Sequence, residues 1–105
     1  MAAKGYWVGR VKVHDPEKYA KYVEAGAPAY AQFGARFLVR GGSYTAVEGD
    51  AYDRNVVIEF PDYETAMACY QSETYSAAKV FRQAGATADI IVVEGYDGPQ
   101  PGESA

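Results

Sequence analysis

The hydrophobic and polar residues of this chain follow two periods, one typical of strands and one typical of helices. Four runs rich in β-branched and aromatic residues predict strands, and they cover residues 6–13, 35–40, 56–60 and 89–94. Residues 43–48 can form a further extended segment after the turn at Gly41 and Gly42. The stretches between the strands carry apolar residues at helical spacing, so strands and helices alternate along the chain.

The first predicted helix begins after Asp15, whose side chain can accept hydrogen bonds from free backbone N–H groups, and has Pro16 at its first position. Pro28 lies inside the helical pattern, so we expect a kink or a short break there, and Gly34 ends the helix. The stripe expected to be buried is made of Tyr19, Tyr22, Val23, Gly26 and Tyr30.

Two more helices are predicted in the second half of the chain. Asp62 caps the first of them, and Ser72 caps the second, which ends at Gly85. The buried side of the first is expected to hold Ala66, Met67 and Tyr70, with Cys69 beside it, and the second runs through Tyr75, Ala78, Phe81 and Arg82.

The order β-α-β-(β)-β-α-α-β predicts the fold class. With right-handed crossovers it gives an α+β, ferredoxin-like fold, an antiparallel sheet with helices on one face. Residues 1–96 are expected to form this single domain. Residues 97–105 contain two prolines and two glycines, and we expect them to be a disordered tail.

Alternation along the strands assigns each residue to one side of the sheet. The face of the sheet that the helices are not expected to cover carries the apolar residues Val8, Leu38 and Val57. It also carries charged residues, which include Arg40 and Glu59. Such a face is too apolar for water and too polar for a dry core, so we expect two copies to pair around a cavity. The side expected beneath the helices carries Trp7, Gly9, Val11, Val13, Phe37, Val39, Val56, Ile58 and Phe60.

Composition argues against several classes of function. The net charge is −4, and the ten Lys and Arg residues are too dispersed to form the positive face that nucleic acid requires. No run approaches the roughly 20 apolar residues of a membrane helix, and no secretory signal is expected at the start. One cysteine, Cys69, and one histidine, His14, leave no disulfide and no zinc ligand set. We therefore expect a cytoplasmic protein without metal or cofactor.

Five blocks of the sequence, in a fixed order, carry a family resemblance. They are Tyr6-Trp7-Val8, Asp15-Pro16-Glu17-Lys18-Tyr19 with Tyr22, residues 34–42, Ile58-Glu59-Phe60-Pro61, and residues 70–75 with Ala78-Lys79. From about Tyr6 to Gly95 the chain resembles the domain of unknown function 1330 family, which belongs to the dimeric α/β barrels. The resemblance implies that fold and a homodimer, but no established activity. Glu73 departs from the pattern, because the family commonly has proline after the serine.

Related barrels include cofactor-independent monooxygenases and muconolactone-isomerase-like enzymes, an analogy of fold alone. Two charged residues could support such chemistry. Arg40, just before Gly41 and Gly42, could bind a carboxylate through paired hydrogen bonds, or simply lie on the surface. Glu59 lies within an apolar strand, where a carboxylate is costly without a partner. It could pair with Arg10 or Arg40, or act as a general base whose pKa is raised by burial.

Tyr22, Tyr70 and Tyr75 could offer hydroxyl groups and apolar walls to a substrate, or could simply pack in the core. Arg82 could add positive charge to the same pocket, or lie in solvent. Ser72 is a helix cap before it is a nucleophile, because no histidine is placed to activate it. A relay between His14 and Asp15 is disfavoured, since adjacent side chains seldom point together, and the Cys69 thiol is expected to be inert.

These residues support two hypotheses, which the sequence leaves open. In the first, the protein is a cofactor-independent enzyme that acts on a small carboxylate or aromatic molecule. In the second, it is a non-catalytic homodimer that binds a small ligand in the same pocket or is associated with stress. The candidate catalytic residues are Glu59 and Tyr70, and the candidate substrate-binding residues are Tyr22, Arg40, Ser72, Tyr75 and Arg82.

Overall fold

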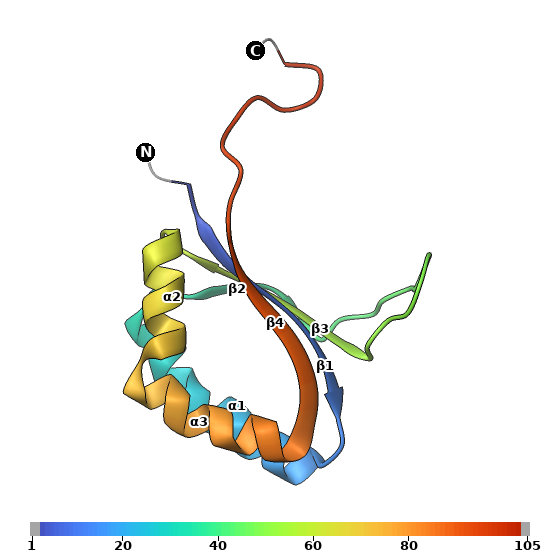
Figure 1. The fold of residues 1–105 in the computed structure, drawn as a ribbon, viewed down its shortest axis with the longest axis vertical. Helices are drawn as coiled ribbons and strands as arrows, with labels where there is room; N and C mark the ends of the chain where they lie inside the picture. The colour runs from blue at the N-terminus through green and yellow to red at the C-terminus, as the bar shows by residue number, and fades with distance from the viewer. Residues whose placement is uncertain (1–2, 104–105) are drawn as a thin grey trace.

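A four-stranded antiparallel sheet with three helices on one of its faces forms the fold (Figure 1). The computed structural model describes residues 3–103. The strands are β1 (Gly5–Val13), β2 (Arg36–Arg40), β3 (Arg54–Phe60) and β4 (Ala86–Glu94), in the spatial order β2-β3-β1-β4. The helices are α1 (Pro16–Gln32), α2 (Tyr63–Gln71) and α3 (Glu73–Gly85). This arrangement confirms the predicted α+β, ferredoxin-like fold class.

Short polar side chains begin all three helices, as predicted. The carboxylate of Asp15 accepts hydrogen bonds from two backbone N–H groups of α1, and that of Asp62 accepts one from α2. The Ser72 hydroxyl accepts one from α3. Each bond gives a partner to a donor that has none within its own helix. Within residues 3–103, no helix is both long and apolar enough to cross a membrane.

Three expectations about the elements are wrong in whole or in part. Helix α1 continues through Pro28 without the short break, and the position is exposed, so water can solvate the carbonyl that loses its helical partner. The segment 43–48 is not a strand, because the chain turns away from the sheet after Gly41 and pairs with nothing. Strands β3 and β4 begin earlier than expected, at Arg54 and Ala86, because each pairs with the long strand β1 as far as these residues.

A β-bulge in β2 changes the side of the sheet on which its last residues lie. The register of β2 against β3 shifts between Phe37 and Val39, which leaves one extra residue in β2. Arg40, opposite Val56, therefore shares the helix-facing side with Phe37. The expectation that Val39 faces the helices and Arg40 the outside is wrong, because strict alternation holds only where no residue is inserted.

The core between sheet and helices is largely aromatic. Trp7 of β1 is 3% exposed and lies at its centre. Its indole N–H donates a hydrogen bond of 2.9 Å to the carbonyl of Ala66 in α2. Its ring lies 4.8–5.7 Å, between centroids, from the rings of Tyr30, Phe60, Tyr70 and Tyr75. One side chain thus joins β1 to all three helices.

The outer face of the sheet has no helix against it (Figure 1). Charged residues share this face, as expected, and Arg10 forms an ion pair of 3.2 Å with Asp89 there. Five of its apolar side chains are 40–58% exposed, namely Val8, Leu38, Val39, Ile91 and Val93, whereas Val57 is half-buried. Tyr96, just after β4, is also exposed, and its hydroxyl donates to the carbonyl of Pro99. Residues 104 and 105 of the expected tail lie outside the described part of the chain.

Gly5 tests the packing of β1 against the start of α2. A Cβ atom here would lie 2.6 Å from the carbonyl carbon of Asp62 and 2.7 Å from Cα of Tyr63, and this backbone cannot rotate away. We predict that Gly5→Ala lowers the free energy of unfolding by roughly 1–3 kcal/mol, measured by urea denaturation. Gly42→Ala is the matched control, since nothing lies within 4 Å of its Cβ position. Equal losses in both variants would contradict this packing.

Candidate functional site

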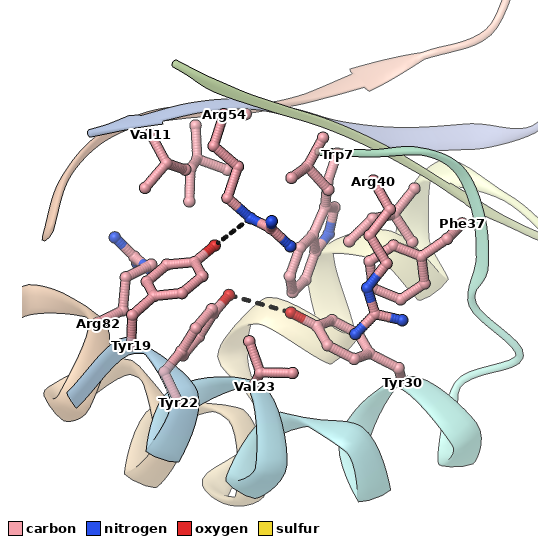
Figure 2. Close-up of a pocket in the computed structure, with 14 residues that line it drawn as sticks. Trp7, Val11, Tyr19, Tyr22, Val23, Tyr30, Phe37, Arg40, Arg54 and Arg82 are labelled. Atoms are coloured by element: carbon pink, nitrogen blue, oxygen red, sulfur yellow. Dashed lines mark hydrogen bonds between the residues drawn. The ribbon is translucent and has the colours of Figure 1, made fainter. Parts of the chain in front are cut away.

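A pocket lies between the helix-facing side of the sheet and α1 (Figure 2). Its volume is about 40 Å³, enough for a few water molecules or a small anionic group. Three arginines line it, Arg40, Arg54 and Arg82, and none of its described lining residues is acidic. The rest of the lining is apolar or aromatic, namely Trp7, Gly9, Val11, Tyr19, Tyr22, Val23, Tyr30, Phe37, Val56, Ile58 and Ile90. The pocket therefore combines apolar walls with three positive charges.

Arg40 reaches the pocket because of the bulge in β2. Without the extra residue, its side chain would point to the outer face of the sheet. The guanidinium carbon lies 4.0 Å from the centroid of the Phe37 ring, which supports the planar cation from one side. Arg40 remains exposed, so its charged group stands where the pocket meets solvent.

Arg54 is the first residue of β3 and lies above Tyr19 of α1. Its Nε donates a hydrogen bond of 3.0 Å to the Tyr19 hydroxyl, and its guanidinium carbon is 5.3 Å from the ring centroid. The guanidinium fills the space beside Gly41, where a Cβ atom would lie 3.1 Å from Cζ of Arg54. Gly41 also has a φ of +68°, so glycine suits this position both in conformation and in space.

Arg82 of α3 is the buried charge of the site, with only 6% of its surface exposed. Its Nε has no hydrogen-bond partner, and no acidic side chain in residues 3–103 forms an ion pair with it. Burial works to lower the pKa of Arg82, but the hydroxyls of Tyr75 and Tyr22 more than offset this, so the pKa lies above its usual value. The guanidinium is therefore charged at every physiological pH.

A chain of three buried tyrosines lies next to Arg82. The Tyr22 hydroxyl is 3.0 Å from that of Tyr30 and 2.8 Å from that of Tyr75. Burial, followed by the neighbouring hydroxyls, raises the pKa of each of these three tyrosines well above its ordinary value. They are consequently neutral near pH 7 and act as hydrogen-bonding groups, not as bases.

The sequence matches, over residues 4–96, the family model described as Domain of unknown function (DUF1330). The chain belongs to the DUF1330 family. The resemblance seen in the five sequence blocks is thereby confirmed. No curated protein is significantly similar to the DUF1330 chain in sequence.

Several solved structures share the fold of this DUF1330 chain. The RPA0582 protein of unknown function from Rhodopseudomonas palustris is 16% identical with a TM-score of 0.76, over 93% of this chain and 86% of that one. SnoaB, a cofactor-independent oxygenase from Streptomyces nogalater, is 14% identical with a TM-score of 0.61, over 97% and 100%. A dimeric ferredoxin-like protein of unknown function from Thermobifida fusca is 14% identical with a TM-score of 0.56, over 89% and 93%. At these identities, the likeness establishes the fold alone.

Four of the predicted site residues of the DUF1330 chain come together. Tyr22, Arg40 and Arg82 line the pocket, and Tyr75 is hydrogen-bonded to Tyr22 behind its wall. They come from α1, β2 and α3, so only the folded chain brings them close. Their role in binding a substrate stays a prediction.

Tyr70 and Ser72 lie outside the pocket lining. The Tyr70 ring packs against Trp7 and Tyr75, with the Lys79 ammonium 4.9 Å from its centroid. The Ser72 hydroxyl donates to the Cys69 carbonyl and accepts from the backbone of α3, so both of its bonds belong to the helix junction. Their geometry fits packing and capping instead of contact with a ligand in this pocket.

Glu59 lies on the outer face of the sheet, away from the arginine pocket. It is opposite Tyr6 of β1, and the Tyr6 hydroxyl donates to it at 3.3 Å. The pKa of Tyr6 is raised, first by burial and then by the Glu59 charge. Neither expected ion pair forms, because the bulge turns Arg40 to the other face and Arg10 pairs with Asp89.

His14 and Cys69 are not part of the pocket lining. His14 Nε2 lies 2.8 Å from the Thr87 hydroxyl at the end of the sheet. Cys69 is fully buried within the stripe of α2, not beside it, and burial raises the pKa of its thiol to about 12. In the described part of the chain, no three His, Cys, Asp or Glu side chains are placed to hold a metal ion.

Arg54 and Tyr19 are site residues that the sequence reasoning missed. Tyr19 was assigned to the buried stripe of the first helix, and Arg54 lies just before the strand that was predicted over residues 56–60. The signal for Arg54 was present, because it continues the alternate series Val56, Ile58 and Phe60 on the helix-facing side of the strand. Extending that strand by two residues would have placed a second arginine in the pocket.

Because of the three buried tyrosines, we expect the protein to lose stability at alkaline pH. In the unfolded chain they ionise near pH 10, whereas in the folded protein they hold their protons to higher pH. Their contribution to stability is therefore complete below about pH 10, the pKa of the unfolded chain. It is lost as the pH rises from there towards the higher pKa of the folded protein. We predict that the free energy of unfolding falls by about 1 kcal/mol per buried tyrosine between about pH 9 and 11.

Urea denaturation across this pH range measures the effect. Tyr75→Phe should make the decline shallower, because one of the three protons is gone. Tyr44→Phe is the control, since that side chain is 50% exposed and should leave the decline as it is. An identical decline in all three proteins would show that the buried tyrosines are not its source.

Proposed function

We propose that this DUF1330 protein binds a small carboxylate-bearing molecule in the arginine pocket. The observation that supports the proposal is the presence of three guanidinium groups around one pocket whose described lining has no carboxylate. Like charges in a partly enclosed site repel one another, and a bound anion would relieve that repulsion. A carboxylate suits arginine especially well, because its two oxygens match two parallel N–H groups.

The apolar walls define what the rest of the ligand can be. Trp7 and the rings of Tyr19 and Tyr30 offer flat apolar surface, so a short carbon chain or a small ring fits their chemistry. The Tyr22 hydroxyl can in addition exchange hydrogen bonds with a ligand oxygen, because it already takes part in a flexible donor–acceptor chain. The ligand in this proposal is a compact organic acid.

Turnover of the bound acid without a cofactor is the second candidate function. It is favoured by the fold shared with SnoaB, a cofactor-independent oxygenase, together with positive charge that would stabilise an anionic form of a substrate. Several pocket groups are poorly suited to remove a proton, since the arginines stay charged and Tyr22 and Tyr30 have raised pKa values, and Glu59 faces outward. We therefore place binding ahead of catalysis.

Trp7 provides a direct assay, because it is the only tryptophan in the sequence and lines the pocket. We predict that butyrate changes Trp7 fluorescence saturably, while the neutral butyramide does not. Arg40→Met should weaken butyrate binding by about tenfold or more, the loss expected for a charged hydrogen bond. Arg36→Met is the matched control, because this arginine of the same strand faces outward beside Glu59.

Equal binding of butyrate and butyramide, or undiminished butyrate binding by Arg40→Met, would contradict the anion site. Oxygen uptake by the acid-bound protein, followed with an electrode, separates the two candidate functions. Uptake that depends on Arg40 would favour turnover, and its absence with intact binding would favour a binding protein.

We also propose that the chain works as a homodimer joined through the outer face of its sheet. The exposed apolar group of Val8, Leu38, Val39, Ile91 and Val93 supports this, because a monomer gains nothing by leaving such a patch in water. A stable interface of about 800 Å² per partner is of the size that a sheet face provides. The structural neighbour from Thermobifida fusca is described as dimeric.

Light scattering tests the dimer. We predict a mass of about twice that of the 11.4 kDa chain at micromolar concentration. Ile91→Lys, at a side chain 58% exposed on the outer face, should shift the protein towards monomer, because it would place a charge inside the interface. Val80→Lys on α3, at a side chain 62% exposed, is the control and should keep the dimer. A monomeric unmodified chain would overturn the proposal.

A further inference from the structure

The arginines of the pocket are separated, not gathered at one point. Arg40 ends β2 and Arg54 begins β3 on the neighbouring strand, whereas Arg82 projects from α3. In Figure 2, Arg40 and Arg82 lie at opposite ends of the row of tyrosine rings on α1, and Arg54 lies between them. The contacts of the two side chains agree with this separation, because the guanidinium of Arg40 stacks on Phe37 and that of Arg82 lies 5.7 Å from the Tyr22 ring centroid.

The end of the pocket at Arg82 has the features of an anion-binding site. Only 6% of the Arg82 surface is exposed, yet its Nε donor has no hydrogen-bond partner, and the groups that influence its pKa are tyrosines. A buried cation without a counter-ion is unfavourable, and the chain keeps one here without supplying a carboxylate of its own. A ligand carboxylate at this end would supply both the missing charge and the missing acceptor.

The Arg40 end has a second, independent capacity for an anion. No described residue forms a salt bridge with Arg40 or Arg54, and Arg54 uses its Nε on the Tyr19 hydroxyl, so its terminal N–H groups remain for a ligand. Gly41, which has no side chain, leaves room for the Arg54 guanidinium next to Arg40. In Figure 2 the tyrosine row lies between the two ends, so each end can take an acidic group of its own.

We propose that the preferred ligand carries two acidic groups, one bound by Arg82 and the other by Arg40 with Arg54, which makes it a short dicarboxylic acid. The inference rests on the proposed binding of a carboxylate in this pocket and specifies its chemical class. The small enclosed volume, about 40 Å³, favours a short chain between the two groups. The apolar middle of the pocket matches the methylene groups of such a chain.

Titrations of Trp7 fluorescence with succinate and butyrate, acids of equal carbon number, test the inference. Succinate should bind at least about tenfold more tightly than butyrate, because its second carboxylate gains charged hydrogen bonds. Arg82→Met and Arg40→Met should each reduce this preference to about twofold or less. Arg36→Met on the outer face should keep it. Thermal unfolding of each variant, with Arg82→Lys as a charge-preserving alternative, shows that the fold is intact.

The possible failures are distinguishable. Equal affinities for succinate and butyrate would overturn the two-acid inference and leave the single-carboxylate proposal in place. A preference for succinate that survives both Met variants would show that other residues hold the second acid, and would overturn the assignment to these arginines. Absence of any saturable change with either acid would overturn this inference and the proposed function together.

Discussion

The cost of burying a positive charge among aromatic side chains governs this structure. Arg82 is buried without an acidic partner, and Tyr22 and Tyr75 are its neighbours there. Those tyrosines also belong to the ring cluster around Trp7 that joins the helices to the sheet. Stability and the electrostatics of the pocket therefore come from the same residues. A chain with ten tyrosines can do this, because each ring supplies apolar surface and each hydroxyl a polar tip.

Arg40 and Arg54 line the same pocket for different structural reasons, and both reasons depend on the edge strand β2. The bulge turns Arg40 inward, and the glycine that follows it leaves room for Arg54. The site is therefore assembled from backbone irregularities as much as from side chains. Bulges that re-aim a side chain beside a binding site are a common use of this device.

Local signals were enough to predict the fold class, the three capped helices and the four strand positions. The helix caps Asp15, Asp62 and Ser72 form hydrogen bonds within their own helices. Their roles can therefore be predicted from a few neighbouring residues. The site was only partly predictable. Whether β2 carries a bulge depends on how it pairs with β3, and that register is a property of the folded sheet. The same limit applies to Glu59, for which an ion pair with Arg10 or Arg40 and a role as general base were both left open, and which accepts from Tyr6 in the folded sheet.

Each strand of the sheet serves two surfaces at once, with one set of alternate residues in the pocket wall and core and the other on the outer face. Gain or loss of a single residue within β1 or β4 would exchange the two sets along the rest of that strand. Insertions and deletions within these strands should therefore be selected against during evolution. Changes in length can be accommodated in the connection between β2 and β3, where residues 42–51 are exposed and pair with no strand. Insertions and deletions among relatives should gather in that connection, while substitutions alone reshape the strands.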